Sequence, residues 1–376
     1  STTYTYDAMG RVTTAAYHDG TREEYGYDRN GLMVSADNTE ARIRLERDPM
    51  GRVVCEKAGL PGGDTFTQVM SVESEYSIYG ERTRVKSSLG ADMRLSYDIP
   101  GLIGGIKAEV ERPEPDKASA KKGNTGKKDI QSWESGILRD DAGRETERFA
   151  TGGIRITTDY DDMGLVRSRH VHSGERHTGW RSYRWDVGAR LMSMRCNLSP
   201  EPVIFDYDGM CNLVRADYSM HESIFRTPDK VGNLYRSESG RDRTYDGGGR
   251  LTSDGEFHYR YDCEGNLVHR SRRNLSDMNS GSTGRIRKGL FGLFSSSENG
   301  EGSSAGSKDT PFADWQPGDT CYKWLANGML AGVKTPDGRT VSFEYDALGR
   351  RVSKTVDGTV RRFGWDGNVV LHEWDT

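Results

Sequence analysis

One short motif, Tyr-Asp-x-x-Gly, recurs along the chain at a spacing near 21 residues. A fixed period of this length is the signature of a repeat architecture, and it limits the fold more than any other feature. Altered copies begin at Arg47, Arg139, Trp185, Tyr207, Pro228 and Trp324. The seven complete copies supply Tyr6, Asp7, Gly10, Tyr27, Asp28, Gly31, Tyr97, Asp98, Gly101, Tyr160, Asp161, Gly164, Tyr245, Asp246, Gly249, Tyr261, Asp262, Gly265, Tyr345, Asp346 and Gly349.

Each repeat has the pattern of a β-hairpin. Residues 11–17 are rich in β-branched and aromatic side chains, and Asp19-Gly20 then gives a strong turn signal. Residues 22–27 alternate back, and the next motif turns the chain again. Because an isolated hairpin is marginal in water, the hairpins must stack on their neighbours. The sequence therefore predicts an all-β ribbon of repeated hairpins.

The motif itself has the chemistry of a turn. An aspartate can accept hydrogen bonds from backbone groups two residues on, and a glycine can take the positive φ of a tight turn. The aromatic residue is expected to cover the neighbouring repeat. Ala189 and Cys211 stand where the motif has glycine. We therefore expect these two turns to use another geometry.

Composition favours a thin sheet over a thick core. Of 376 residues only 34% are hydrophobic, and 46 are glycine. The net charge of −4 gives no steering toward nucleic acid, and no apolar run is long enough to predict a membrane helix. The first residues already belong to a repeat. We therefore expect no signal peptide there, and we expect the chain to be part of a longer protein.

Changes in composition divide the chain into five segments. Residues 1–112 carry repeats that are degenerate over 61–96, residues 131–271 carry further repeats, and residues 311–376 carry the best-preserved ones. Residues 113–130 are predicted to be a polar, flexible insertion. Residues 272–310 form a Ser- and Gly-rich insertion with a basic, then apolar, patch at 285–294. That patch is expected to fold back onto the sheet, and plugging a cavity, binding a partner and meeting a membrane are the alternatives.

No residues are predicted to be catalytic, metal-binding or cofactor-binding. His170 and His172 share a face if they lie on a strand, and His177 is near them in sequence, but no acidic or thiolate ligand completes a metal pattern. Asp48-Pro49-Met50-Gly51 looks like a self-cleavage sequence, yet it is in register with the repeats and is predicted to be a turn. The five widely spread cysteines are predicted to be reduced thiols.

The recurring Tyr-Asp-x-x-Gly-Arg resembles the RHS, or YD, repeat family. That family includes bacterial polymorphic toxins, Tc-toxin shell subunits and animal teneurins. Residues 345–354 and 361–374 are similar to the last core repeats of bacterial RHS toxins. In those toxins a self-cleaving Asp-Pro-x-Gly-Leu element and a variable toxin follow, and this sequence stops before either.

The resemblance implies a β-ribbon that spirals into a hollow shell around a toxin. It implies a non-catalytic, encapsulating part of a secreted bacterial toxin, made in the cytoplasm and exported, for example by type VI secretion, for competition between bacteria. The expected partners are the enclosed C-terminal toxin, the remaining shell segments and a secretion-system spike or chaperone, with no nucleic acid, membrane span or cofactor. The alternative is a surface module that binds a carbohydrate or a receptor.

Overall fold

The computed structural model describes residues 2–62, 65–111, 130–218, 223–275 and 312–376. These residues contain strands and turns and no helix, so the prediction of an all-β ribbon of hairpins is confirmed. Consequently no helix in the described ranges could span a membrane. The predicted insertions at 113–130 and 272–310, including the patch at 285–294, lie almost entirely outside the described residues.

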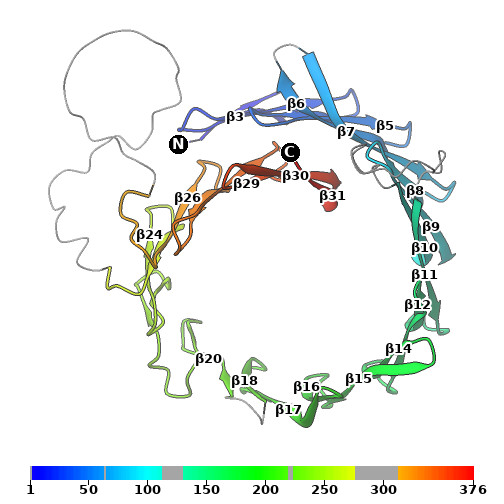
Figure 1. Cartoon of the computed structure of the whole chain (residues 1–376), viewed down its shortest axis with the longest axis vertical. Coiled ribbons are helices and arrows are strands. Elements are labelled where there is room, and N and C mark those ends of the chain that lie inside the picture. The colour runs from blue at the N-terminus through cyan, green and yellow to red at the C-terminus, as the bar shows by residue number, and fades with distance from the viewer. Residues whose placement is uncertain (1, 63–64, 112–129, 219–222, 276–311) are drawn as a thin grey trace, which may run out of the picture. The chain divides into compact units, whose positions relative to one another are not determined.

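The chain divides into two compact units. The first unit combines residues 1–71 with residues 250–376, and the second holds residues 72–249. Within each sheet successive strands pair antiparallel in chain order, which is the pairing that a row of hairpins gives. Figure 1 shows the strands of the N-terminal part in blue and those of the C-terminal part in orange and red.

The first unit has an N-terminal and a C-terminal set of strands, which belong to different sheets. Its N-terminal strands are β1 (Thr3–Tyr6), β2 (Val12–Ala16), β3 (Arg22–Tyr27), β4 (Met33–Asp37), β5 (Arg42–Arg47), β6 (Val53–Gly62) and the first part of β7 (Thr65–Tyr76). Its C-terminal strands are β23 (Leu251–Ser253), β24 (His258–Tyr261), β25 (Leu267–Ser271), β26 (Thr320–Trp324), β27 (Leu330–Lys334), β28 (Thr340–Tyr345), β29 (Arg351–Val356), β30 (Thr359–Asp366) and β31 (Val369–Asp375).

The second unit continues the hairpins from the rest of β7. Its long strands are β8 (Arg82–Ser87), β9 (Ala91–Ile99), β10 (Leu102–Glu111), β11 (Ile130–Arg139), β12 (Glu145–Ala150), β13 (Ile154–Tyr160), β14 (Val166–Ser173), β15 (Arg176–Trp185), β16 (Leu191–Cys196), β17 (Ser199–Tyr207) and β18 (Leu213–Asp217). Four strands of two residues follow, namely β19 (Ile224–Phe225), β20 (Thr227–Pro228), β21 (Leu234–Tyr235) and β22 (Thr244–Tyr245).

The motif aspartate closes its own turn. In the first repeat, Asp7 Oδ1 accepts hydrogen bonds from the backbone N–H groups of Met9 (2.9 Å) and Arg11 (3.0 Å), and Asp7 Oδ2 pairs with Arg11 Nε at 2.6 Å. The backbone hydrogen bond from Arg11, together with its guanidinium, lowers the pKa of the Asp7 carboxyl. The Arg11 guanidinium also lies 4.6 Å from the ring centroid of Tyr27 in the next repeat. One side chain therefore links two successive turns.

The aromatic residue of the motif also donates a hydrogen bond to the preceding hairpin. The Tyr27 hydroxyl donates to the carbonyl of Val12 in the preceding hairpin at 2.9 Å, and the Tyr160 hydroxyl donates to Glu145 at 2.8 Å. In two of the altered copies another donor makes the same kind of bond. Trp185 Nε1 donates to Val166 at 2.8 Å, and Arg47 Nε donates to Met33 at 3.2 Å. Trp185 and Arg47 therefore replace the tyrosine as the donor to the preceding hairpin.

Ala189 and Cys211 correct one expectation from the sequence. Their φ angles are 60° and 67°, in the left-handed region that Gly164 occupies at 79°. Ala189 N donates to Asp186 O at 3.1 Å, and Cys211 N donates to Asp208 O at 3.0 Å. The prediction of another turn geometry is therefore wrong. The carboxylate-closed turn holds a non-glycine residue in a conformation that it rarely adopts.

Candidate functional site: a clasp between the first and last repeats

The last complete motif is buried against the first repeats of the chain. Asp346 is 1% exposed, Ala347 6% and Arg350 6%. We use the name clasp for Asp346, Arg350 and Glu56 together with Tyr25 and Asn38. All five residues belong to the first unit. Burial of a charged turn requires partners for its charges, and the N-terminal repeats supply them.

Arg350 is the centre of the clasp. Its Nε lies 2.8 Å from Asp346 Oδ2, and its Nη1 lies 2.6 Å from Oε1 of Glu56, which is 9% exposed and belongs to β6. Arg350 Nη1 also donates to the carbonyl of Gly367 at 2.8 Å. Burial opposes the charge of the guanidinium, but the two carboxylates prevail and raise the pKa of Arg350 above its ordinary value.

Two further hydrogen bonds reach the backbone of the buried motif from β3 and from the turn after β4. The Tyr25 hydroxyl donates to the carbonyl of Ala347 at 3.0 Å, and Asn38 Nδ2 donates to the carbonyl of Tyr345 at 2.8 Å. Beside them Ala347 packs against Ala36 and Ile43, which are 0% and 1% exposed. The turn is therefore held by ion pairs, hydrogen bonds and apolar contact at once.

The clasp extends over several repeats in matching order. Earlier in the chain, Asp19 Oδ2 accepts from the backbone N–H of Ala326 at 3.2 Å. The sequence separations of this bond, the Asn38 bond and the Arg350–Glu56 pair are 307, 307 and 294 residues. Because Asp19, Asn38 and Glu56 meet Ala326, Tyr345 and Arg350 in that order, these C-terminal turns follow the N-terminal repeats in the same direction.

A second buried polar cluster joins β25 to the residue just before β26. Asp319, 2% exposed, accepts from Ser271 Oγ at 2.5 Å and lies 3.0 Å from His269 Nε2, and Arg273 also donates to it. Burial opposes the charge of Asp319, but the hydrogen bonds from Arg273, Ser271 and His269 lower its pKa to about 2. Ser271 and His269 both bind the carboxylate, so they do not form a nucleophile–base pair. The cluster fastens two strands.

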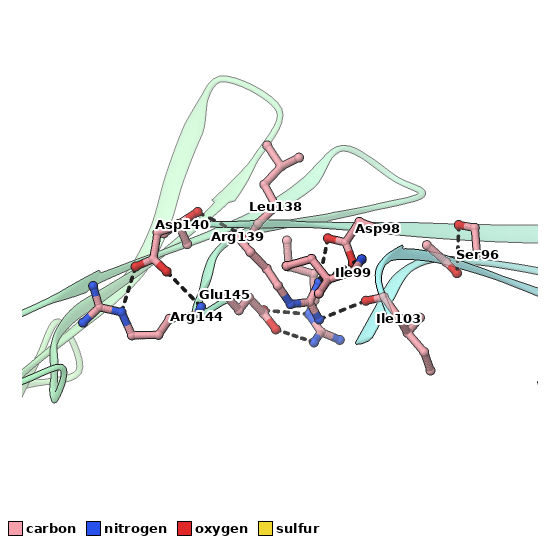
Figure 2. A network of polar contacts seen from close by, with 12 residues as sticks. Ser96, Asp98, Ile99, Ile103, Leu138, Arg139, Asp140, Arg144 and Glu145 are labelled. Carbon is pink, nitrogen blue, oxygen red and sulfur yellow. Dashed lines mark hydrogen bonds and ion pairs between the residues drawn. The ribbon is translucent and has the colours of Figure 1, made fainter. Parts of the chain in front are cut away.

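In one repeat of the second unit, Arg139 stands at the motif's aromatic position and binds two groups of the preceding hairpin. Asp98 lies in β9 rather than in a turn, and Arg139 Nη1 binds its Oδ2 at 3.0 Å. Arg139 Nη2 donates to the carbonyl of Ile103 at 2.9 Å, which is the bond to the preceding hairpin that tyrosine makes elsewhere. Figure 2 shows Arg139 between Asp98 and Ile103, with Asp140 closing its own turn through Arg144.

The remaining candidates from the sequence are resolved individually. Asp48 closes a repeat turn with Gly51 N donating to its carbonyl at 2.9 Å, as the register predicts. All five cysteines are free, as predicted. His177 on β15 contacts both His170 and His172 on β14. In the described part of the chain, no group of three or more His, Cys, Asp or Glu side chains could hold a metal ion.

Sequence reasoning missed the partners of the buried motif. Glu56 follows an altered motif, and nothing in its local sequence distinguishes it from other strand glutamates. His269 and Asp319 are 50 residues apart, on either side of the predicted insertion. A pattern that repeats every 21 residues describes one hairpin and its neighbours, so it carries no signal for contacts about 300 residues apart.

Comparison with known proteins points to one family. Residues 324–360 match the family model described as RHS Repeat. The chain is 25% identical over 251 residues to "Probable deoxyribonuclease RhsA" of Dickeya dadantii (strain 3937), covering 62% of this chain and 14% of the relative. It is 22% identical over 428 residues to "Double-stranded DNA deaminase toxin A" of Burkholderia cenocepacia (strain H111), covering 99% and 27%.

Solved structures agree on the fold. A crystal structure of TcdB2–TccC3 without its hypervariable C-terminal region matches with a TM-score of 0.56 at 13% identity, covering 97% of this chain and 21% of that one. TcdB2–TccC3–Cdc42 matches with a TM-score of 0.50 at 12% identity, covering 100% and 21%. The chain thus spans from about a seventh to about a quarter of the length of these curated relatives. The chain therefore contains an RHS repeat at residues 324–360, is related to Rhs proteins and shares the fold of TcdB2–TccC3.

Proposed function

We propose that this chain forms part of the wall of a shell that encloses a toxin domain, and that it is itself non-catalytic. The clasp is the observation that carries the proposal. Within the first unit, the ribbon's last repeats lie on its first repeats in matching order, joined by Arg350 and Glu56 across 294 residues. A ribbon that overlaps itself in this way can seal a wall.

The way in which the ribbon overlaps itself supports a wall that continues beyond the overlap. The N-terminal and C-terminal strands of the first unit belong to different sheets, so side chains and turns join them rather than a strand ladder. Backbone pairing between the two sheets would occupy the sheet edge on which a further repeat pairs, whereas contacts through turns leave that edge unpaired. The small buried side chains Ala36 and Ala347 allow the layers to approach closely.

The two relatives support a carrier role in a second way. One is named a deoxyribonuclease and the other a deaminase toxin, yet both match this chain. Proteins named for different chemistries share the repeats, which fits a common scaffold with a variable active domain elsewhere. On this proposal the enclosed toxin and the other shell segments are the partners. Export from the bacterial cytoplasm, for example by a type VI system, is part of the same proposal.

Protease protection of the cargo tests the proposal directly. The longer gene product that contains this chain is digested with a nonspecific protease, and survival of the domain downstream of Thr376 is followed by mass spectrometry. The intact protein is expected to protect that domain, and Arg350→Met to expose it. Arg144→Met, which alters the same motif position away from the clasp, is the matched control and is expected to keep protection. Equal cleavage of the downstream domain in the intact protein and in Arg350→Met would contradict the proposal.

A further inference from the structure

The turn at Asp7 has almost the same sequence as the docked turn at Asp346. Residues 6–11 read Tyr-Asp-Ala-Met-Gly-Arg, and residues 345–350 read Tyr-Asp-Ala-Leu-Gly-Arg. We call them the first turn and the docked turn. Gly10 and Gly349 have φ angles of 79° and 77°, and each aspartate pairs with the Nε of its own arginine, at 2.6 Å in the first turn and 2.8 Å in the docked turn. The two turns therefore present the same shape to a partner.

Burial distinguishes the two turns. Leu348 of the docked turn is 38% exposed, and Met9 at the same position of the first turn is 80% exposed. Ala347 is buried against the N-terminal repeats, whereas Ala8 is exposed. Leucine and methionine exchange in packed sites at little cost, so the first turn can occupy a site of the kind that holds the docked turn.

The exposed methionine recurs at this position of the motif. Met50 precedes the glycine of the Asp48 turn, and 80% of it is exposed. In the second unit Met163 and Met210 hold the same position, with 65% and 84% exposed. A single exposed apolar residue is ordinary on a protein surface, but one that recurs at the same point of several turns indicates a contact surface. Methionine suits such a surface because its side chain adapts to the shape of a partner.

The clasp shows the surface on which such a turn docks. The docked turn accepts hydrogen bonds from Tyr25 and Asn38 through the carbonyls of Ala347 and Tyr345. Asn38 lies in the turn between β4 and β5, whereas the first turn lies between β1 and β2. Because successive turns of antiparallel hairpins lie on opposite sides of the ribbon, the N-terminal repeats receive a turn on one side and present their own motif turns on the other. The docked turn fills the site at Asn38, so the first turn needs another site of the same kind.

We propose, on the basis of the proposed function of this chain as part of a wall, that the first turn and the Asp48 turn dock on a further layer of repeats in the longer protein. They would bind the side of that layer that corresponds to Asn38. The receiving layer would supply a hydroxyl or amide donor to the backbone of the turn and a small apolar residue beside it, as Tyr25, Asn38 and Ala36 do in the clasp. Each layer has one side of each kind, so the contact can repeat from layer to layer.

Oxidation of methionine by hydrogen peroxide tests the docking without any substitution. The longer gene product is oxidised in its native state and after unfolding in urea, and mass spectrometry of its peptides gives the rate at each methionine. Met9 and Met50 are expected to react at least about tenfold more slowly in the native protein, because oxidation follows exposure. Met70, which is 2% exposed, should also react slowly and reports that the repeats are folded. Equal native and unfolded rates at Met9 and Met50, with Met70 protected, would overturn the proposal.

Photochemical cross-linking identifies what covers the first turn. The photo-reactive amino acid p-benzoylphenylalanine replaces Met9 in the longer gene product, and in a matched control it replaces Leu348. The control should link to the N-terminal repeats, because Ala347 beside it packs against Ala36 and Ile43. The probe at Met9 is expected to link, within the same polypeptide, to a turn of another layer of repeats.

Cross-links from the probe at Met9 to the toxin domain or to a second copy of the protein would overturn the inference, as would the absence of any link while the Leu348 control reacts. Protease protection of the toxin domain is measured in the same preparation. Protection of that domain without a link from Met9 to another layer would overturn the docking of the first turn and leave the proposed function standing.

Discussion

The motif turns at Asp140 and Asp346 are locally alike and differently placed. In both, the arginine four residues on lies with its Nε 2.8 Å from the aspartate Oδ2 and donates its backbone N–H to Oδ1 at 2.9 Å. The Asp140 pair is 25–38% exposed, whereas the Asp346 pair is 0–6% exposed. Local sequence therefore determines the geometry of the turn, and contact with other repeats determines whether its ion pair is buried.

The largest expected effect separates these two arginines. Arg350→Met leaves Asp346 and Glu56 buried without their cation, and it should lower the free energy of unfolding by about 3–5 kcal/mol. Arg144→Met breaks a partly exposed pair and should cost no more than about 1 kcal/mol. Urea unfolding of the purified chain measures both. Equal losses of unfolding free energy in the two variants would contradict the difference between the buried and the exposed turn.

Acid should reveal the buried carboxylate at Asp319. Its pKa falls from an ordinary value of 3.8 to about 2, so its contribution is complete above pH 4 and is lost as the pH falls from 4 to 2. That contribution is about 2 kcal/mol. We therefore expect the stability difference between the natural chain and Asp319→Asn, measured by urea unfolding at several pH values, to shrink below pH 4. A stability difference that stays constant down to pH 2 would show that the pKa of Asp319 is not lowered in the folded chain.

The smallest expected effect comes from exchanging alanine and glycine at the positive-φ position of two motif turns. Ala189 has a φ of 60°, so Ala189→Gly should stabilise the chain by about 1 kcal/mol by removing the cost of a left-handed alanine. The reverse change, Gly164→Ala, should destabilise it by a similar amount, since Gly164 has a φ of 79°. Thermal unfolding of the two variants gives the comparison. Destabilisation by Ala189→Gly would mean that its side chain contributes packing that outweighs the strain.

The sequence was sufficient for the hairpins and insufficient for the contacts between layers. Asp-Gly turns, alternating strands and the 21-residue period predict each hairpin, because the interactions that form a hairpin are local. Glu56 and Arg350 meet across 294 residues, and that contact depends on how the intervening repeats curve. No local pattern encodes such a curve. The same holds for the bulge at His172, which one extra residue creates and which alternation alone does not predict.

Amide hydrogen exchange tests the central claim, that the last motif is docked on the first repeats. Leu348 and Arg350 donate their backbone N–H groups to Asp346 at 3.0 and 2.9 Å, and Ala142 and Arg144 donate theirs to Asp140 at 3.1 and 2.9 Å. The local bonds are matched, so only burial by the neighbouring repeats distinguishes them. Much slower exchange at Arg350, which is 6% exposed, than at Arg144 is the predicted result. Equal exchange at the two turns would show that the clasp does not hold in solution.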